Sequence, residues 1–451
     1  MTSERMMEIY SALQDVIARR NSACVYTSLG YTSNLDLIPA FTAKDLNRLL
    51  AEYLPDGCLQ EMKPAERIRN MPELLGTIVY FCLSGTGGEV DIEDPDLIRA
   101  SFPCRNAMGG TAVQAALALD RLGAGSVVHL SDDSRQVREQ LISPNIKVPL
   151  PDGSLGSAGD EDGGTSPETH VIIQFQKGSR ICLGDQAETI PVSNRLILTR
   201  NTVNASLPLD ENYLRWVEVH ARQVSSNVLS SLNSILDPEV LKLRMARILE
   251  HVERYRSQNP RGIVYFEDAH YHSRDIRRLC IETLYPHVDI MSMNEEELRC
   301  TMDMFQQPIE IEDIFSCVNN VEYLLDRFGI KKGSIVHTKD YAMFVGDADG
   351  LEIEKGMVYG SLMATARAAF GVYGNDAQIR KILEGSLSRA GQENLEKIEN
   401  SSLRDRVILV PTFALDRPKF TIGLGDCFTG GVQLCFGNPQ LYCAVIQEEE
   451  M

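Results

Sequence analysis

The chain has 451 residues and a formal net charge of −19. It is longer than the ~250 to 300 residues at which single cores stop growing, so we expect two domains, and its acidity argues against a nucleic-acid partner. Eleven cysteines without a Cys-x-x-Cys pair suit free thiols in a reducing compartment, and no run approaches the ~18 apolar residues of a membrane span, so we expect a cytoplasmic protein without a membrane partner.

Helix and strand patterns alternate along most of the chain. Helical periodicity or composition predicts helices at 4–20, 44–53, 112–122, around 273–284, from 294 onward and around 357–370. Short apolar runs predict strands at 23–29, 126–130, 263–266, 287–291 and 334–337. This alternation predicts an α/β fold whose mostly parallel sheet is covered on both faces, with ligands at the carboxyl ends of the strands.

One region departs from this alternation. Residues 170–176 and 195–199 are predicted as a strand pair without an intervening helix. Hairpin-like structure inside a parallel-sheet protein indicates a β-rich insertion.

The run at 421–431 places an acidic residue among glycines at the predicted start of a helix. Glycine lets backbone N–H groups approach an anion, and a helix N-terminus adds partial positive charge. Asp426 would then accept the proton of an attacking hydroxyl while Gly423, Gly425 and the N–H groups through Cys427 hold the phosphoryl oxygens. The alternative is a glycine-rich turn with Asp426 as an ordinary helix cap.

Two further polar segments, at 34–36 and 106–110, lie next to predicted strands or helices and could contact a sugar. Asn34 and Asp36 are expected at the end of the first strand, where carboxamide and carboxylate groups can bind sugar hydroxyls or simply form an Asx turn. Asn106 precedes Gly109-Gly110, which would bring backbone close to a sugar or form a plain turn into the next helix.

Glu267 ends one predicted strand, and Asn294 and Glu297 follow the next. Carboxylates at neighbouring strand ends suit a hydrated Mg²⁺, which needs only one or two of them. The adjacent Glu295 and Glu296 fit a solvated helix N-terminus, where negative charge is stabilising.

In this order, the motifs resemble those of ribokinase-like sugar kinases, and most closely their ADP-dependent glucokinase and phosphofructokinase branch. The resemblance runs from about residue 25 to about residue 430 and implies a ribokinase-like, Rossmann-type core with a smaller, discontinuous α/β lid. We expect the lid at 31–45, 82–103 and 166–199, and the large nucleotide-binding core at 1–30, 46–81, 104–165 and 200–451. A Walker Gly-x-x-x-x-Gly-Lys loop is absent from the sequence.

The resemblance also implies roles for further residues. Where the family has His-x-Glu, this chain has Tyr265 before Glu267, so only the glutamate is carried over. His337 and Thr338, with Gly425, fall where the family binds its nucleotide, and Lys177 and Arg195 fall where phosphofructokinase members bind the acceptor phosphate.

The two cations could equally be solvated charges at strand ends. Gly88 falls where family glucokinases place a carboxylate and phosphofructokinases a small residue, although a shift of one residue would present Glu89 instead.

We therefore expect a Mg²⁺-dependent kinase that transfers a phosphoryl group from ADP to a hexose or hexose phosphate, with fructose 6-phosphate favoured and glucose next. The expected partners are a nucleotide and a sugar, and the expected state is a monomer or small homo-oligomer. The alternatives are an ATP-using sugar or nucleoside kinase of the same fold, and a non-catalytic sensor that retains the fold.

Overall fold

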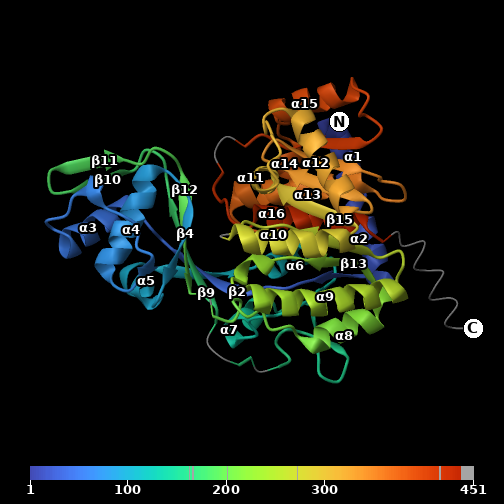
Figure 1. Ribbon diagram of the computed structural model, residues 1–451, viewed down its shortest axis with the longest axis horizontal. Coiled ribbons are helices and arrows are strands. Elements are labelled where there is room, and N and C mark those ends of the chain that lie inside the picture. The colour runs from blue at the N-terminus through green and yellow to red at the C-terminus, as the bar shows by residue number, and fades with distance from the viewer. Residues whose placement is uncertain (162, 165–166, 201, 272, 416–417, 438–451) are drawn as a thin grey trace, which may run out of the picture.

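The chain folds into a large and a small part, each built on its own sheet (Figure 1). The computed structural model describes residues 1–437 except 162, 165–166, 201, 272 and 416–417. Among these residues, no helix is both long and apolar enough to cross a bilayer.

The large part contains a ten-stranded sheet in the order β18-β17-β16-β15-β14-β13-β1-β6-β7-β8. Its strands are β1 (Tyr26–Leu29), β6 (Ser126–Val128), β7 (Ile146–Pro149), β8 (Leu155–Gly156), β13 (Val224–Leu229), β14 (Ile263–Glu267), β15 (Ile290–Asn294), β16 (Gly333–His337), β17 (Tyr341–Gly346) and β18 (Val407–Pro411). From β16 to β7 all neighbours pair in parallel, and only β17, β18 and β8 join antiparallel.

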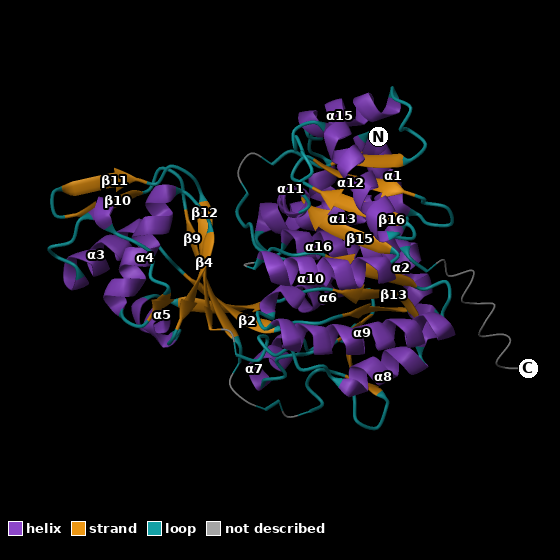
Figure 2. Ribbon diagram, in the orientation of Figure 1, coloured by secondary structure: helices purple, strands orange, loops and turns teal. Residues whose placement is uncertain are grey.

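Helices cover both faces of this sheet (Figure 2), which confirms the predicted fold class. One layer contains α1 (Ser3–Ser11), α2 (Leu13–Ser22), α6 (Thr111–Leu122), α13 (Ile353–Phe370), α14 (Asp376–Leu383) and α16 (Leu424–Val432). The other contains α8 (Glu211–Val219), α9 (Pro238–Gln258), α10 (Arg274–Leu284), α11 (Glu295–Met304) and α12 (Ile314–Phe328). Two short helices, α7 (Arg135–Gln140) and α15 (Arg389–Glu399), complete the large part. Adjacent strand residues such as Val228 and Leu229 belong to opposite core clusters, as a sheet buried on both sides requires.

The small part contains a six-stranded sheet in the order β3-β4-β12-β9-β2-β5 and a separate β10-β11 hairpin. Its elements are β2 (Asn34–Pro39), α3 (Ala43–Tyr53), β3 (Arg67–Ile68), α4 (Met71–Ser84), β4 (Gly88–Ile92), α5 (Asp96–Ser101), β5 (Cys104–Gly109), β9 (Thr169–Phe175), β10 (Arg180–Leu183), β11 (Gln186–Thr189) and β12 (Asn194–Arg200). The expected strand pair is present as antiparallel β9 and β12.

Two expected boundaries differ from this packing. Residues 46–81 were expected in the large core. The apolar faces of α3 and α4 instead pack against the small sheet, through Leu46, Leu50, Leu74 and Ile78. Residues 104–109 were also expected in the large core, yet they form β5 and pair with β2.

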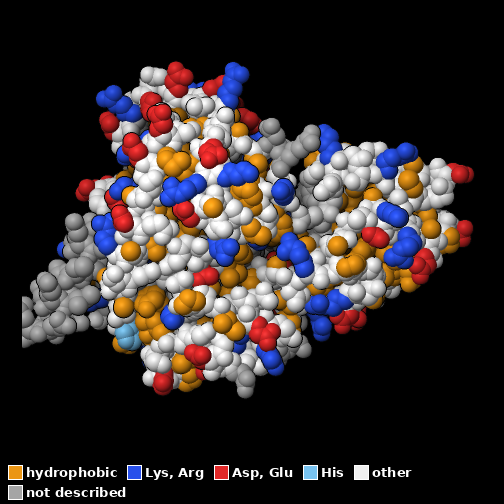
Figure 3. Space-filling view, turned by 180° about the vertical axis from the view of Figure 1, so that it is seen from behind, with side chains coloured by type: hydrophobic (Ala, Val, Ile, Leu, Met, Phe, Trp, Pro, Cys, Tyr) orange, Lys and Arg blue, Asp and Glu red, His pale blue; other side chains and the backbone are white. Residues whose placement is uncertain are grey.

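The chain crosses between the two parts four times, after β1, after β5, after β8 and after β12. Hydrogen bonds join three of these crossings: Asn204 donates to the Ser33 carbonyl (3.3 Å), and the Glu168 carboxylate accepts hydrogen bonds from the Thr202 and Val203 N–H groups (2.9 and 2.8 Å). Seen from behind, the small part is narrower than the large part, and Lys, Arg, Asp and Glu side chains are interspersed on both (Figure 3).

Candidate active site

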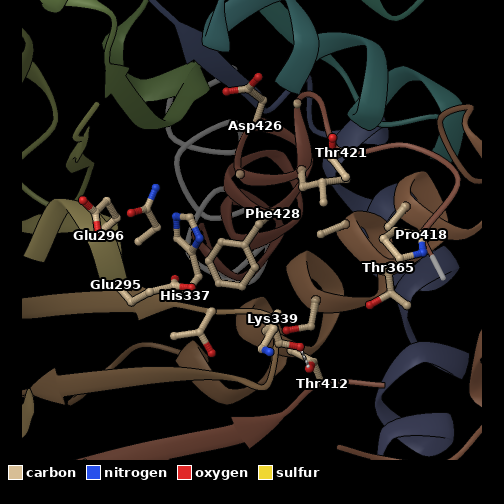
Figure 4. A pocket seen from close by; sticks show the side chains of 18 of the residues that line it. Glu295, Glu296, His337, Lys339, Thr365, Thr412, Pro418, Thr421, Asp426 and Phe428 are labelled. Atoms are coloured by element: carbon tan, nitrogen blue, oxygen red, sulfur yellow. Dashed lines mark hydrogen bonds between the residues drawn. The ribbon is translucent and has the colours of Figure 1, made fainter. Parts of the chain in front are cut away.

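A cavity of about 1000 Å³ opens at the carboxyl ends of β14, β15 and β16 and is bounded by α13 and the start of α16. Most of its lining comes from the large part, and Arg195 of β12 reaches it from the small part. Figure 4 shows Asp426 and His337 in this cavity, with Thr365 and Thr412 farther along its wall. Thr338 also lines the cavity, in a turn held by the Tyr341 N–H donating to its hydroxyl (3.0 Å).

The N-terminus of α16 lies within the glycine motif, where the sequence predicted the start of a helix. Gly423 takes a left-handed φ of 68°, and no side chain caps the helix there. A Cβ at Gly423 would lie 2.0 Å from Gln114 Oε1, and one at Gly425 would lie 3.3 Å from His337 Cε1. The first-turn N–H groups of Leu424, Gly425 and Asp426 have no partner within the helix, so they can bind an oxyanion.

The N–H of Cys427 is occupied. It donates to the Gly423 carbonyl at 3.1 Å, the first hydrogen bond of α16, and the side chain is buried. The run of free N–H groups at the start of α16 is therefore one residue shorter than the sequence suggested.

Asp426 projects from the first turn of α16 into the cavity. Burial raises its pKa to about 6; the hydrogen bond with Thr111 opposes this shift and the charge of Glu267 adds to it. A carboxylate with this pKa is mostly ionised at pH 7 and is more basic than an exposed one, which suits a proton acceptor.

Glu267 and His337 form a pair beside this helix start. His337 Nε2 lies 3.0 Å from Glu267 Oε1, and its ring packs on Phe428 with centroids 4.7 Å apart. Burial opposes a charge on His337, but the hydrogen bond and the negative charge of Glu267 outweigh it and raise the pKa. His337 thus lies next to Glu267 and Gly425, rather than farther along the cavity with Thr412.

Asn294 and Glu297 lie where β15 becomes α11, and their side chains form a capping box. The Glu297 N–H donates to Asn294 Oδ1 (2.9 Å), and the Asn294 N–H donates to Glu297 Oε2 (2.8 Å). Burial and the charge of Asp268 raise the pKa of Glu297 to about 8.

This group suits a divalent cation bound mainly through water. Within the described residues Glu267 Oε2 is buried without a hydrogen-bond partner. Burial first, and then the charges of Asp268 and Glu267, disfavour the ionised form of Glu297, and a nearby cation would favour it. The described residues contain no cluster of three or more His, Cys, Asp or Glu side chains that forms a direct cage. Mg²⁺ does not need one, because it retains several waters. Tyr265, which replaces the family histidine, is buried against Phe436.

Asn34 and Asp36 lie within β2 of the small sheet, not at the end of the first strand as predicted. Asn34 Nδ2 donates to Asp36 Oδ1 (2.8 Å). Gly109 of β5 is directly opposite Asn34, and a Cβ there would lie 2.1 Å from Asn34 Nδ2. Gly110 takes φ 95°, with its backbone against the Thr32 carbonyl. Glycine is required at both positions for this close approach.

Asn106, an expected sugar contact, faces away from Asp36. It pairs with Leu37, and alternate residues of a strand point to opposite faces, so Ala107 rather than Asn106 lies on the face of Asp36.

His170 is a site residue that the sequence analysis missed. On β9 it pairs with Asp36, and its Nδ1 lies 3.3 Å from Asn34 Nδ2. Burial raises the pKa of Asp36 to about 6, against the effect of His170. The regular alternation of the β9 segment could have suggested an inward His170, but only the strand register shows which face it shares.

Of the residues proposed to distinguish the two acceptors, Arg195 lies at the cavity and Lys177 does not. Arg195 lines the cavity and its Nη1 lies 3.5 Å from the Thr421 carbonyl, whereas Lys177 is exposed in the β9–β10 turn and does not line the cavity. Gly88 faces α4, where a Cβ would lie 2.2 Å from Phe81. Glu89 pairs with Ile197 and so shares the face of His170.

These features can be set beside known proteins. The family described as "ADP-specific Phosphofructokinase/Glucokinase conserved region" matches residues 27–432. The chain is 22% identical to the ADP-specific phosphofructokinase of Thermococcus zilligii, covering 93% of this chain and 96% of the relative. It is 23% identical to the ADP-dependent glucose/glucosamine kinase of Pyrococcus abyssi, covering 88% and 91%.

A solved structure of an ADP-dependent kinase in complex with fructose 6-phosphate and ADPβS shares the fold. Its TM-score is 0.75 at 18% identity, over 96% of this chain and 97% of that one. With the family match spanning nearly the whole chain, the chain belongs to the ADP-specific phosphofructokinase/glucokinase family.

Proposed function

We propose that this protein transfers a phosphoryl group from ADP to a hydroxyl of a hexose or hexose phosphate. One observation carries the proposal: the uncapped N-terminus of α16 presents Asp426 to a large cavity, with the sugar-type residues Asn34 and Asp36 on the facing sheet. Burial raises the pKa of Asp36, and the negative charge of Asp426 adds to that shift, so each carboxylate lies within electrostatic reach of the other, which supports placing both at one acceptor site.

In the proposed reaction, Asp426 accepts the proton of the acceptor hydroxyl as its oxygen attacks the β-phosphorus of ADP. The bond to the bridging oxygen breaks and AMP leaves. The N–H groups of Leu424 and Gly425 stabilise the negative charge on the equatorial oxygens of the moving phosphoryl group. Asn34 and Asp36 orient the acceptor, and Gly109 lets its ring approach the backbone.

Glu267 and Glu297 would hold Mg²⁺ and its waters, and Asn294 would fix the position of Glu297 through the capping box. When bound, the ion supplies positive charge that offsets the charge of the phosphates. His337 is proposed to orient Glu267.

The acceptor has two candidates, each favoured by one observation. Glu89, on the cleft face near His170, favours a free hexose, because a carboxylate accepts hydrogen bonds from hydroxyls and repels a phosphate. Arg195, which reaches the cavity, favours a hexose phosphate because it can bind a dianion bidentately.

A crossed assay tests the proposal. ADP and ATP are each combined with glucose, fructose 6-phosphate and adenosine, and product formation is followed chromatographically, with Asp426→Asn as the control for contaminating kinases. We expect turnover with ADP and at least one hexose. Turnover only with ATP or only with adenosine would replace this proposal with the related-kinase alternative, and no turnover would favour a sensor.

The oligomeric state, expected to be a monomer or small homo-oligomer, is measured by sedimentation.

A further inference from the structure

Two arginines, Arg105 and Arg367, lie near the proposed acceptor site, where the two parts of the molecule meet. Neither belongs to the described lining of the large cavity, which we call the nucleotide cavity. Arg367 of α13 is only 5% exposed. Its guanidinium carbon lies 4.1 Å from the Tyr373 ring centre and 4.4 Å from that of Phe420. Aromatic rings therefore pack on the guanidinium, and its hydrogen-bond donors remain available in its plane.

Those in-plane donors are almost unused. Nη1 reaches the Gly371 carbonyl at 3.5 Å, the outer limit of a hydrogen bond, and the buried Nε has no partner within the described residues. A guanidinium in such surroundings usually pairs with an oxyanion, because an unpaired buried charge is costly.

Arg105 approaches the same ring from the small part. Its guanidinium carbon lies 5.6 Å from the Phe420 ring centre, and it pairs across the strands with Ile38, on the sheet face that carries Asp36. Burial and the positive charge of Arg367 lower the pKa of Arg105. In the described part of the chain neither arginine forms an ion pair.

Phe420 fixes where this pair lies. Its ring is 4% exposed and packs with Ile38 and Ile172 of the small sheet, so it sits between the two parts. Neither Arg105 nor Arg367 lines the nucleotide cavity within the described residues. Asp36 and Asp426 lie within electrostatic reach of Arg367, which places the pair next to the proposed acceptor site.

Both guanidinium groups lie beside the ring of Phe420, so their like charges repel each other, and an anion bound near both would offset that repulsion. The carboxylates near Arg367 offset part of its charge. The pKa of Arg105, in contrast, is lowered by burial and by the positive charge of Arg367. The edge of the acceptor site formed by β5 is therefore cationic and has hydrogen-bond donors to spare.

We propose that Arg105 and Arg367 form an oxyanion subsite around Phe420 that takes a phosphate or carboxylate group at the β5 edge of the acceptor site. The assignment to an acceptor substituent rests on the proposed function and is an alternative to contact of that substituent with Arg195. The same chemistry also fits a free inorganic anion, and the two sources differ in what they do to acceptor binding.

The test is calorimetric titration of the full chain without nucleotide, so binding is measured apart from phosphoryl transfer. Fructose 6-phosphate and glucose are titrated into the wild type, Arg105→Gln and Arg367→Met, and the phosphorylated sugar is titrated again in the presence of inorganic phosphate. Arg99→Gln, which removes an exposed arginine from α5, is the matched control. The exposed Arg105 keeps the test informative if the buried Arg367 variant fails to fold.

We expect both variants to weaken fructose 6-phosphate at least ~10-fold while glucose stays within about 2-fold, since a charge-assisted contact is lost. If phosphate competes with the sugar phosphate, the subsite takes the acceptor's own substituent. If phosphate binds the wild type without competing and is lost in both variants, the subsite takes a free anion.

Unchanged binding of fructose 6-phosphate and phosphate in both variants overturns the subsite. Wild-type binding of glucose alone, with neither fructose 6-phosphate nor phosphate bound, also overturns it and leaves the hexose-kinase proposal intact. If no sugar binds and no turnover occurs, the proposed function fails, and the phosphate titration still decides the subsite.

Discussion

Asp426→Asn is the substitution that separates phosphoryl transfer from binding most cleanly. Asparagine keeps the shape of the side chain and can still bond Thr111, but it has no basic carboxylate. A positioned general base contributes ~10²-fold to 10⁴-fold, so we expect kcat to fall at least ~10²-fold, equivalent to at least about 2.7 kcal/mol. The KM for the acceptor and the Kd for ADP should stay close to those of the wild type, because the lost interaction develops only during transfer.

The pKa of Asp426 predicts the pH dependence of the same step. Burial raises that pKa to about 6, so about nine-tenths of the carboxylate is ionised at pH 7 and about one-tenth at pH 5. Only the ionised form accepts a proton. We therefore expect kcat/KM to fall as the pH drops through about 6 and to lose at least tenfold per pH unit below 5, because Asp36, whose pKa is also about 6, becomes protonated over the same range.

Rates are measured as AMP release between pH 4.5 and 8, with circular dichroism at each pH to verify folding. Glu296→Gln is the matched control, since this exposed carboxylate lines the same cavity but pairs with Arg299. A kcat for Asp426→Asn within a few-fold of wild type, or a wild-type profile that stays flat to pH 4.5, would refute the base assignment.

Three further outcomes follow from the structure. Asp36→Asn should abolish sugar binding and, above pH 6, should stabilise the fold by at most about 3 kcal/mol. Burial raises the pKa of Asp36 to about 6, so ionisation of wild-type Asp36 costs stability as the pH rises from about 4 to 6. A difference between the denaturation midpoints of wild type and variant that is the same at pH 5 and pH 8 would contradict this. Gly423→Ala should lower Tm and kcat through its clash with Gln114, whereas Gly178→Ala, with φ 86° and open space, should show only the backbone cost; equal losses would exclude the clash. Glu297→Gln should raise the Mg²⁺ concentration for half-maximal rate ~10-fold or more, and overlapping Mg²⁺ titrations would make it a helix cap alone.

The large sheet could be predicted because its strands are continuous apolar runs between helical patterns. The strand at Ile263–Glu267 and the helix at Arg274–Leu284 were found almost at their true bounds. The first helix was predicted as one element because its periodicity continues through Ala12, where the chain instead turns between α1 and α2. The strand expected at 287–291 extends to Asn294, because its polar end enters the site rather than the core.

The acceptor site could be predicted only in part, because it depends on strand register. A shift of one residue exchanges the two faces of a strand, and the sequence contains no signal for that choice at Asn106 or Gly88. The register places Ala107 and Glu89 on the sheet face of Asp36 instead, together with His170 from a distant segment. Asp426 and Gly423 were easier, since a helix start carries its own local geometry.

The four crossings between the two parts limit how the molecule can move and how it can change over evolution. A body joined by one linker can swivel in any direction, but one joined at four points, with hydrogen bonds at Ser33, Glu168, Thr202 and Asn204 joining three of them, keeps few degrees of freedom. Any opening must bend all four connections together, which favours a hinged rotation over free swivelling. By the same reasoning, the small part cannot be removed or exchanged as a contiguous gene segment, because its strands are contributed by separate stretches of the chain on either side of α6.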